Sequence, residues 1–118
     1  MALIREGRVR RAWLGVGGET VPLSRRYVRH FGLARDSGVR IQSVEADSPA
    51  VIAGLARDDI IVGIDDAPIA NVDDLQRALG FDAIGREVQL VVLRRDRKLA
   101  LAAVPRERMA GDGKRSRR

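Results

Sequence analysis

Cysteine is absent from this 118-residue sequence, and aromatic side chains make up only 3% of it. Without cysteine the chain has neither a disulfide framework nor a thiolate zinc site. No apolar run approaches the roughly 20 residues that a membrane-spanning helix needs. A chain of this length has room for one hydrophobic core, since domains usually contain about 100–150 residues. We therefore expect one small globular domain that holds no metal ion and no cofactor.

The net charge of +6 originates in the two ends of the chain. Residues 12–105 contain 12 Lys and Arg against 13 Asp and Glu, so the basic excess lies outside them. Residues 106–118 combine basic residues with Gly and Ser, which predicts a basic disordered tail. A small basic nucleic-acid-binding domain is an alternative interpretation. It lacks the aromatic residues, interleaved with the charges, that would stack on bases.

The first seven residues contain neither the apolar stretch nor the small-residue cleavage site of a secretory signal. This leaves two interpretations, a cytoplasmic protein or a piece cut from a longer precursor. We favour the cut piece, in which residues 1–7 are the remnant of an upstream linker or domain end.

Apolar spacing and capping residues predict strands that alternate with short helices. Ser24, Ser48 and Asn71 are placed as N-caps of three helices, and Gly32 and Gly54 follow the first two as terminators. Period-two alternation predicts strands between and after these helices, and the last two strands form a hairpin. The expected order is strand 16–21, helix 25–31, strand 39–44, short helix 49–53, strand 58–65, a strand around Ile69, helix 72–79 and a hairpin over 88–103.

The sequence contains no recognisable catalytic set. It has one histidine and no cysteine, and no serine lies in a Gly-x-Ser-x-Gly elbow. Neighbouring aspartates such as Asp65 and Asp66 point in different directions and cannot share a proton or a metal ion. We therefore expect no catalytic residue and no metal ligand in this chain.

The stretch "WLGVGG", residues 13–18, offers backbone amides with few side chains around them. The N–H groups of Leu14, Gly15 and Val16 can turn toward one point, because Gly15 tolerates backbone conformations closed to other residues. Such a nest binds an anion. If the following strand has an unpaired edge, an extended peptide can pair with it and place its terminal carboxylate in the nest. A plain β-bulge or tight bend is the alternative interpretation.

Four segments together resemble a PDZ domain in their order and spacing: "WLGV" at 13–16, "GVRIQSVEADSPAVIAGL" at 38–55, "DDIIVGIDDAPI" at 58–69 and "DDLQRAL" at 73–79. The resemblance covers residues 8–105 and is greatest to the C-terminal PDZ domains of bacterial HtrA/Deg-type serine proteases. A PDZ domain from another envelope protein, such as a site-2-type metalloprotease or a secretion component, is the alternative.

The resemblance implies an α+β fold, a partly open antiparallel β-barrel of five to six strands capped by two helices. It implies a non-catalytic module that binds hydrophobic C-terminal tails or unfolded protein tails by strand addition. An upstream protease domain and a periplasmic or envelope location in the parent protein follow from the same likeness, although a cytoplasmic one stays open. The carboxylate-binding residues carried over are Leu14, Gly15, Val16 and Arg11. The residues carried over to the peptide groove are Gly17, Gly18, Val21, Val72, Gln76 and Leu79.

Overall fold

The computed structural model describes residues 10–109, which form two antiparallel sheets and several short helices. The strands are β1 (Arg10–Trp13), β2 (Val16–Pro22), β3 (Ser37–Val44), β4 (Ile60–Ile64), β5 (Ala67–Pro68), β6 (Val88–Arg94), β7 (Arg97–Ala103) and β8 (Arg106–Met109). The helices are α1 (Arg25–Phe31), α2 (Pro49–Ala53) and α3 (Val72–Ala78), followed by the 3-10 turn η2 (Phe81–Ala83). None of these helices is long and apolar enough to cross a membrane.

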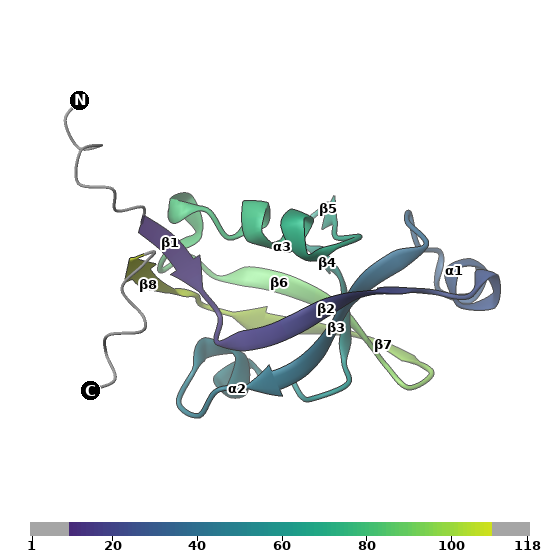
Figure 1. Cartoon of the computed structure of the whole chain (residues 1–118), viewed down its shortest axis with the longest axis horizontal. Coiled ribbons are helices and arrows are strands. Elements are labelled where there is room, and N and C mark those ends of the chain that lie inside the picture. Colours follow the sequence, from purple (N-terminus) through teal and green to yellow (C-terminus); the bar gives the residue numbers. More distant parts are fainter. Residues whose placement is uncertain (1–9, 110–118) are drawn as a thin grey trace.

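The main sheet has six antiparallel strands and does not close into a barrel. Its order is β2-β3-β4-β6-β7, and β5 pairs with β4 beside this path. Helix α3 lies against the β2 edge and α2 against the β7 strand (Figure 1). This arrangement confirms the expected partly open antiparallel fold with helices over its open sides.

The ends of the helices lie where the capping residues predicted them. The Ser48 hydroxyl accepts a hydrogen bond from the Val51 amide at 3.2 Å, and Gly54 ends α2 with φ 93°. At the start of α3, the Asn71 side chain accepts from the Asp74 amide at 2.8 Å. Each cap satisfies a backbone donor that has no partner within the helix.

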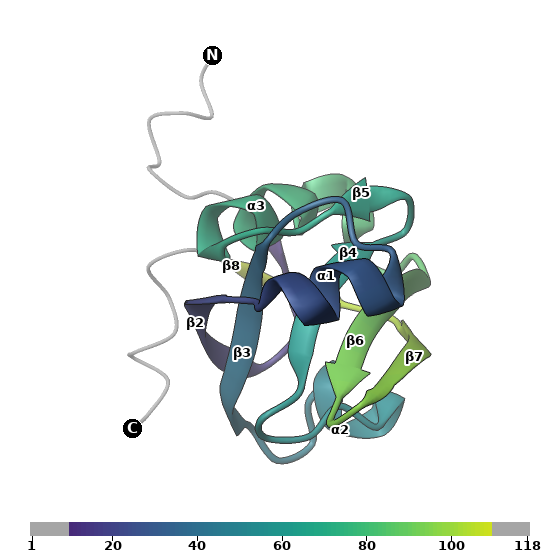
Figure 2. The same cartoon turned by 90° about the vertical axis from the view of Figure 1, so that its right-hand side faces the viewer.

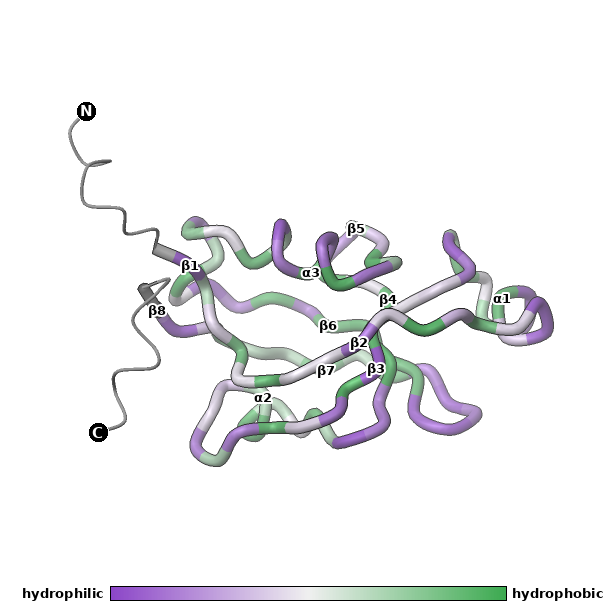
Figure 3. Tube along the Cα trace, in the orientation of Figure 1, coloured by the Kyte–Doolittle hydropathy of each residue, from purple (hydrophilic) through white to green (hydrophobic). Residues whose placement is uncertain are grey.

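The hydrophobic core lies between the sheet and α3. Its completely buried side chains come from the central strands and include Val39, Ile41, Ile61, Leu90 and Val92. Figure 3 shows hydrophobic positions concentrated in the strands at the centre of the molecule and hydrophilic ones in the turns. Burial of a side chain of this size contributes about 1.5–3 kcal/mol, so the central strands supply most of the driving force for folding.

Helix α1 stands apart from this core. It contains no buried residue, and its apolar side chains Tyr27, Val28 and Phe31 are only half-buried. Figure 2 looks onto the end of the molecule that α1 covers. The helix therefore covers the end of the sheet without adding to the core.

The pairing of β1 with β8 differs from the sequence-based expectation. In this two-stranded sheet Trp13 lies opposite Arg106 and Arg10 opposite Met109. Residues 106–109 therefore belong to the folded domain and not to a disordered tail. The composition of the segment did not reveal this, because a strand ladder joins main-chain groups and depends little on side-chain polarity. The expectations for residues 1–7 and 110–118 lie outside the described residues.

Candidate functional site

A groove of about 460 Å³ lies between β2 and α3. Because β2 ends the strand order of the main sheet, one of its edges faces α3 and not another strand. The groove walls are apolar: Leu14, Leu75 and Leu79 line it and are each less than a tenth exposed. Among the described residues that line the groove, Arg11 is the only charged one. The site is an apolar cleft with a cation at its rim.

Eight of the ten residues predicted for the site line this groove: Arg11, Leu14, Gly15, Val16, Gly18, Val72, Gln76 and Leu79. Gly17 and Val21 are not among the lining residues. Side chains alternate along a strand, so Val16 and Gly18 face α3 while Gly17 and Val21 face the other way. A Cβ at Gly17 would lie 2.7 Å from the Ser43 hydroxyl on β3, which confirms its direction.

Four lining residues were missed by the sequence analysis: Ala12, Trp13, Val39 and Leu75. Leu75 lies three residues after Val72 and four before Leu79, a spacing that places all three on one helix face. This spacing alone predicts that Leu75 lines the groove with the other two. Val39 lies below Gly18, where an added Cβ would come within 2.6 Å of its Cγ1. Only the register of β2 against β3 reveals that this glycine lies beside Val39.

Two hydrogen bonds fix the loop that joins β1 to β2. The Leu14 carbonyl accepts from the Ala50 amide at 2.9 Å, and the Gly15 carbonyl accepts from the Glu45 amide at 2.8 Å. In a trans peptide the N–H points opposite to the C=O of the same unit, and no cis peptide is present in residues 10–109. The amides of Gly15 and Val16 are therefore turned away from α2 and β3.

Among the described residues, the Leu14 and Gly15 amides have no backbone acceptor in the loop. In the part of the chain that the structure describes, no hydrogen bond outside the helices and strands has the Leu14 or Gly15 amide as its donor. Gly15 has φ 87°, a left-handed conformation that favours glycine. The loop thus offers an anion-binding nest at the end of the groove.

The outer edge of β2 is also free to pair. Ile41 lies opposite Gly18 and directs both its N–H and its C=O away from β2. Its N–H donates to the Asp59 carbonyl and its C=O accepts from the Asp58 amide, each at 2.8 Å, just before β4. Gly18 and Ile41 are therefore a non-hydrogen-bonded pair, and the main-chain groups of Gly18 point to the open side. An extended chain in the groove can form ladder bonds with them.

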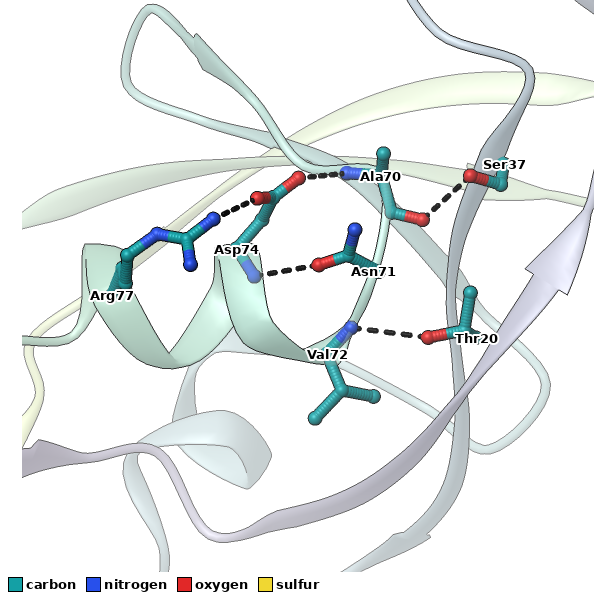
Figure 4. A network of polar contacts seen from close by, with 7 residues as sticks. All are labelled: Thr20, Ser37, Ala70, Asn71, Val72, Asp74 and Arg77. Carbon is teal, nitrogen blue, oxygen red and sulfur yellow. Dashed lines mark hydrogen bonds and ion pairs between the residues drawn. The ribbon is translucent and has the colours of Figure 1, made fainter.

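Helix α3 is held to neighbouring strands at both of its ends. At its start, the Thr20 hydroxyl accepts from the Val72 amide at 3.1 Å, and Ser37 donates to the Ala70 carbonyl at 2.7 Å (Figure 4). Past its last turn, the Ala12 amide of β1 donates to the Leu79 carbonyl at 3.1 Å. These contacts fix the width of the groove before any ligand enters. Within residues 10–109 no group of His, Asp and Glu side chains could hold a metal ion.

Comparison with known proteins gives one family. A family model described as "PDZ domain" matches residues 15–104. Serine endoprotease DegS of Escherichia coli (strain K12) is 31% identical over 106 residues, which are 89% of this chain and 29% of the relative. A probable periplasmic serine endoprotease DegP-like of Halomonas elongata is 34% identical over 92 residues, 78% of this chain and 19% of the relative. The chain spans less than a third of these curated relatives.

Solved structures share the fold. The HtrA-type protease AlgW with a decapeptide is 30% identical with a TM-score of 0.68, covering 91% of this chain and 32% of that one. The HtrA3 PDZ domain bound to a phage-derived ligand (FGRWV) has a TM-score of 0.64 at 24% identity, covering 89% of this chain and 94% of that one. The chain therefore belongs to the PDZ domain family, and its relatives carry this domain within HtrA-type serine proteases.

Proposed function

We propose that this chain binds the hydrophobic C-terminal tails of other polypeptides by adding them to the edge of β2. The observation that carries the proposal is the pair of amides at Gly15 and Val16, turned outward at the end of an apolar groove. A carboxylate accepts hydrogen bonds from such amides, and Arg11 on the groove rim supplies a charge of the opposite sign. The chain contributes binding and no catalytic group.

The strand register sets how a ligand lies. Its carboxylate occupies the Gly15 nest, and its last side chain enters the pocket beside Val16, Leu75 and Leu79. Because the strand period is two, the third residue from the ligand's end lies opposite Gly18 and the fifth lies opposite Thr20. The second residue from the end points away from the groove.

The relatives support a role in a larger protein. AlgW is described with a decapeptide, and a variant of the same protease with a tripeptide, at 30% identity in each case. By this likeness we propose that the chain selects substrates for an HtrA-like serine protease, or regulates it, in the periplasm or cell envelope. This likeness favours the protease over another envelope protein as the parent, and a peptide over a nucleic acid as the ligand.

The last side chain of the ligand should dominate specificity. A peptide that ends in Val should bind more tightly than one that ends in Lys, by roughly tenfold to 150-fold, because burying an apolar side chain contributes about 1.5–3 kcal/mol. Fluorescence polarisation with labelled peptides measures the ratio. Moving the Lys to the second position from the end, which faces solvent, is the matched control and should cost little. Equal losses at the two positions would contradict the proposed register.

The hydrogen bond between Thr20 and Val72 should limit the length of ligand that the groove reads. The fifth residue from the ligand's C-terminal end would lie opposite Thr20, where the hydrogen bond already connects β2 to α3. Peptides of three and six residues should therefore bind with similar affinity. Thr20→Val keeps the side-chain shape but removes the acceptor. It should tighten the six-residue peptide alone, by about twofold to tenfold, the value of one ladder bond. Thr20→Ser keeps the hydroxyl and should behave as the natural sequence. If the natural chain bound the six-residue peptide much more tightly than the three-residue one, the proposed limit on ligand length would be wrong.

A further inference from the structure

Basic and acidic residues are nearly equal in number over residues 12–105, but in the folded domain many of the basic ones gather at one end. We define the basic tip as α1, the loop 32–36 and the turn 95–98 between β6 and β7. It contains 7 Lys and Arg and only 2 Asp. The rest of residues 10–109 contains 9 basic and 12 acidic residues. The domain thus has a strongly cationic end and a weakly anionic remainder.

Two hydrogen bonds bring the parts of the basic tip together, although they are far apart in sequence. The Tyr27 hydroxyl donates to the Arg95 carbonyl at 3.1 Å, and Lys98 Nζ donates to the Phe31 carbonyl at 3.2 Å. Figure 1 shows α1 and the β6–β7 turn at the same end of the molecule, and Figure 3 shows hydrophilic positions there. The basic residues of the two segments form one surface.

The charges of the basic tip are not neutralised within the domain. Arg40, Arg77, Arg86 and Arg94 form ion pairs with carboxylates of the described residues, and no basic side chain of the tip does. None of these arginines belongs to the tip, whose basic side chains are all exposed. Uncompensated cations on one surface attract a polyanion, with a strength that falls as salt rises.

The position and shape of the basic tip favour a broad, flat partner. Arg10 and Met109 lie opposite each other in the β1–β8 sheet at the other end of the molecule (Figure 1). The described chain therefore begins and ends at the end of the molecule away from the tip. The tip is a protruding helix and turn at one end of the 48 Å long axis.

The aromatic side chains at the basic tip disfavour nucleic acid as the partner. The rings of Tyr27 and Phe31 pack edge to face, with centroids 5.6 Å apart. The Tyr27 hydroxyl is also held by the Arg95 carbonyl. Rings engaged in this way are not presented as a platform on which bases stack.

We propose that the basic tip holds this chain on membranes that carry anionic phospholipid headgroups. A Lys or Arg within about a Debye length of such a surface contributes about fivefold in affinity. This proposal is independent of the peptide groove, which lies between β2 and α3 and shares no lining residue with the tip. A chain held in this way keeps its groove free for a peptide.

The test compares two variants of the whole chain that lose the same net charge. One carries Arg25→Gln and Arg29→Gln in the tip, and the other carries Arg77→Gln and Arg86→Gln outside it. Both keep the basic residues of the chain ends, so the comparison isolates the tip. Cosedimentation with phosphatidylglycerol-containing vesicles should show about 25-fold weaker binding for the tip variant and little change for the other. Vesicles of phosphatidylcholine alone should bind neither variant.

Several results would overturn the proposal. These are equal losses in the two variants, binding that does not distinguish the two vesicle types, or no binding by the natural chain. Tighter binding to a DNA oligonucleotide than to the vesicles, lost in the tip variant, would assign the tip to nucleic acid instead. The tip variant should bind peptide as the natural chain does, which shows that it is folded.

Discussion

A peptide whose C-terminal carboxylate is converted to an amide should bind this chain roughly 30-fold to 1000-fold more weakly than the free peptide. The amides of Gly15 and Val16 are directed outward by the bonds from Ala50 and Glu45 that hold the loop carbonyls. A carboxylate accepts charge-assisted hydrogen bonds from both, whereas the carbonyl of a terminal amide accepts only neutral ones and its NH2 group is a donor. The loss corresponds to about 2–4 kcal/mol, since each of the two bonds falls from about 1.5–3 to about 0.5–1.5 kcal/mol.

Isothermal titration calorimetry with the free and amidated forms of one peptide measures this ratio. Acetylation of the peptide's other end removes a charge far from the nest, so it serves as the control and should leave the affinity nearly unchanged. Similar affinities for the free and amidated peptides would show that the nest does not bind a carboxylate. The proposed function would then fail with it.

The test changes the peptide and not the protein, because any substitution of Gly15 would also disturb the fold. A Cβ at this position would lie 2.3 Å from Cβ of Ser48, which is completely buried and caps α2. The residue also has φ 87°, which strains any other side chain. Loss of binding in a Gly15 variant would therefore report the damaged fold and not the missing contact.

Asp59→Asn should destabilise the domain by about 1.5–3 kcal/mol. This is the cost of breaking the ion pair between the buried Asp59 carboxylate and the partly exposed Arg94. Asp59 is 2% exposed and accepts from the Ala56 amide at 2.9 Å and from Arg94 Nε and Nη2 at 2.9 and 2.7 Å. Its hydrogen bond and charge raise the pKa of Arg94. An amide group would direct a donor toward Arg94 or toward the Ala56 N–H.

Thermal unfolding followed by circular dichroism checks this prediction, with a fall in Tm of roughly 4–8 °C for each kcal/mol in a domain of this size. Asp58→Asn is the matched control, since it removes the same charge from the neighbouring position. The Asp58 side chain is 73% exposed and lies 3.5 Å from Arg40. An exposed ion pair of this kind contributes at most about 1 kcal/mol. Equal shifts for the two variants would contradict the role of the buried network.

Local sequence patterns predicted most of the elements, because caps and strand alternation act over a few residues. Ser24, Ser48 and Asn71 begin α1, α2 and α3 as predicted, and Gly32 and Gly54 end the first two in the left-handed conformation. The outward amides of the "WLGVGG" loop were also predicted. Their direction depends on the carbonyl anchors at Ala50 and Glu45, which only the structure shows.

The lining of the groove was only partly predictable. The resemblance placed Gly17 and Val21 in it, but strand alternation turns both away. Conversely, Leu75 was not among the residues predicted for the groove, and Val39 lines it beside Gly18, which has no side chain. Which side chains meet across a groove depends on the register between strands, and this is not encoded in any single segment.

The sequence by itself determined the helix ends, most of the strands and the glycine-containing turn of the loop 13–18, since each depends on neighbours within a few residues. The tertiary structure decided the β1–β8 pairing, the Thr20 contact with α3 and the separation of charge into a basic tip and a weakly acidic remainder. A balanced charge count conceals that separation, because Coulomb interactions depend on distance in space, and the fold sets those distances.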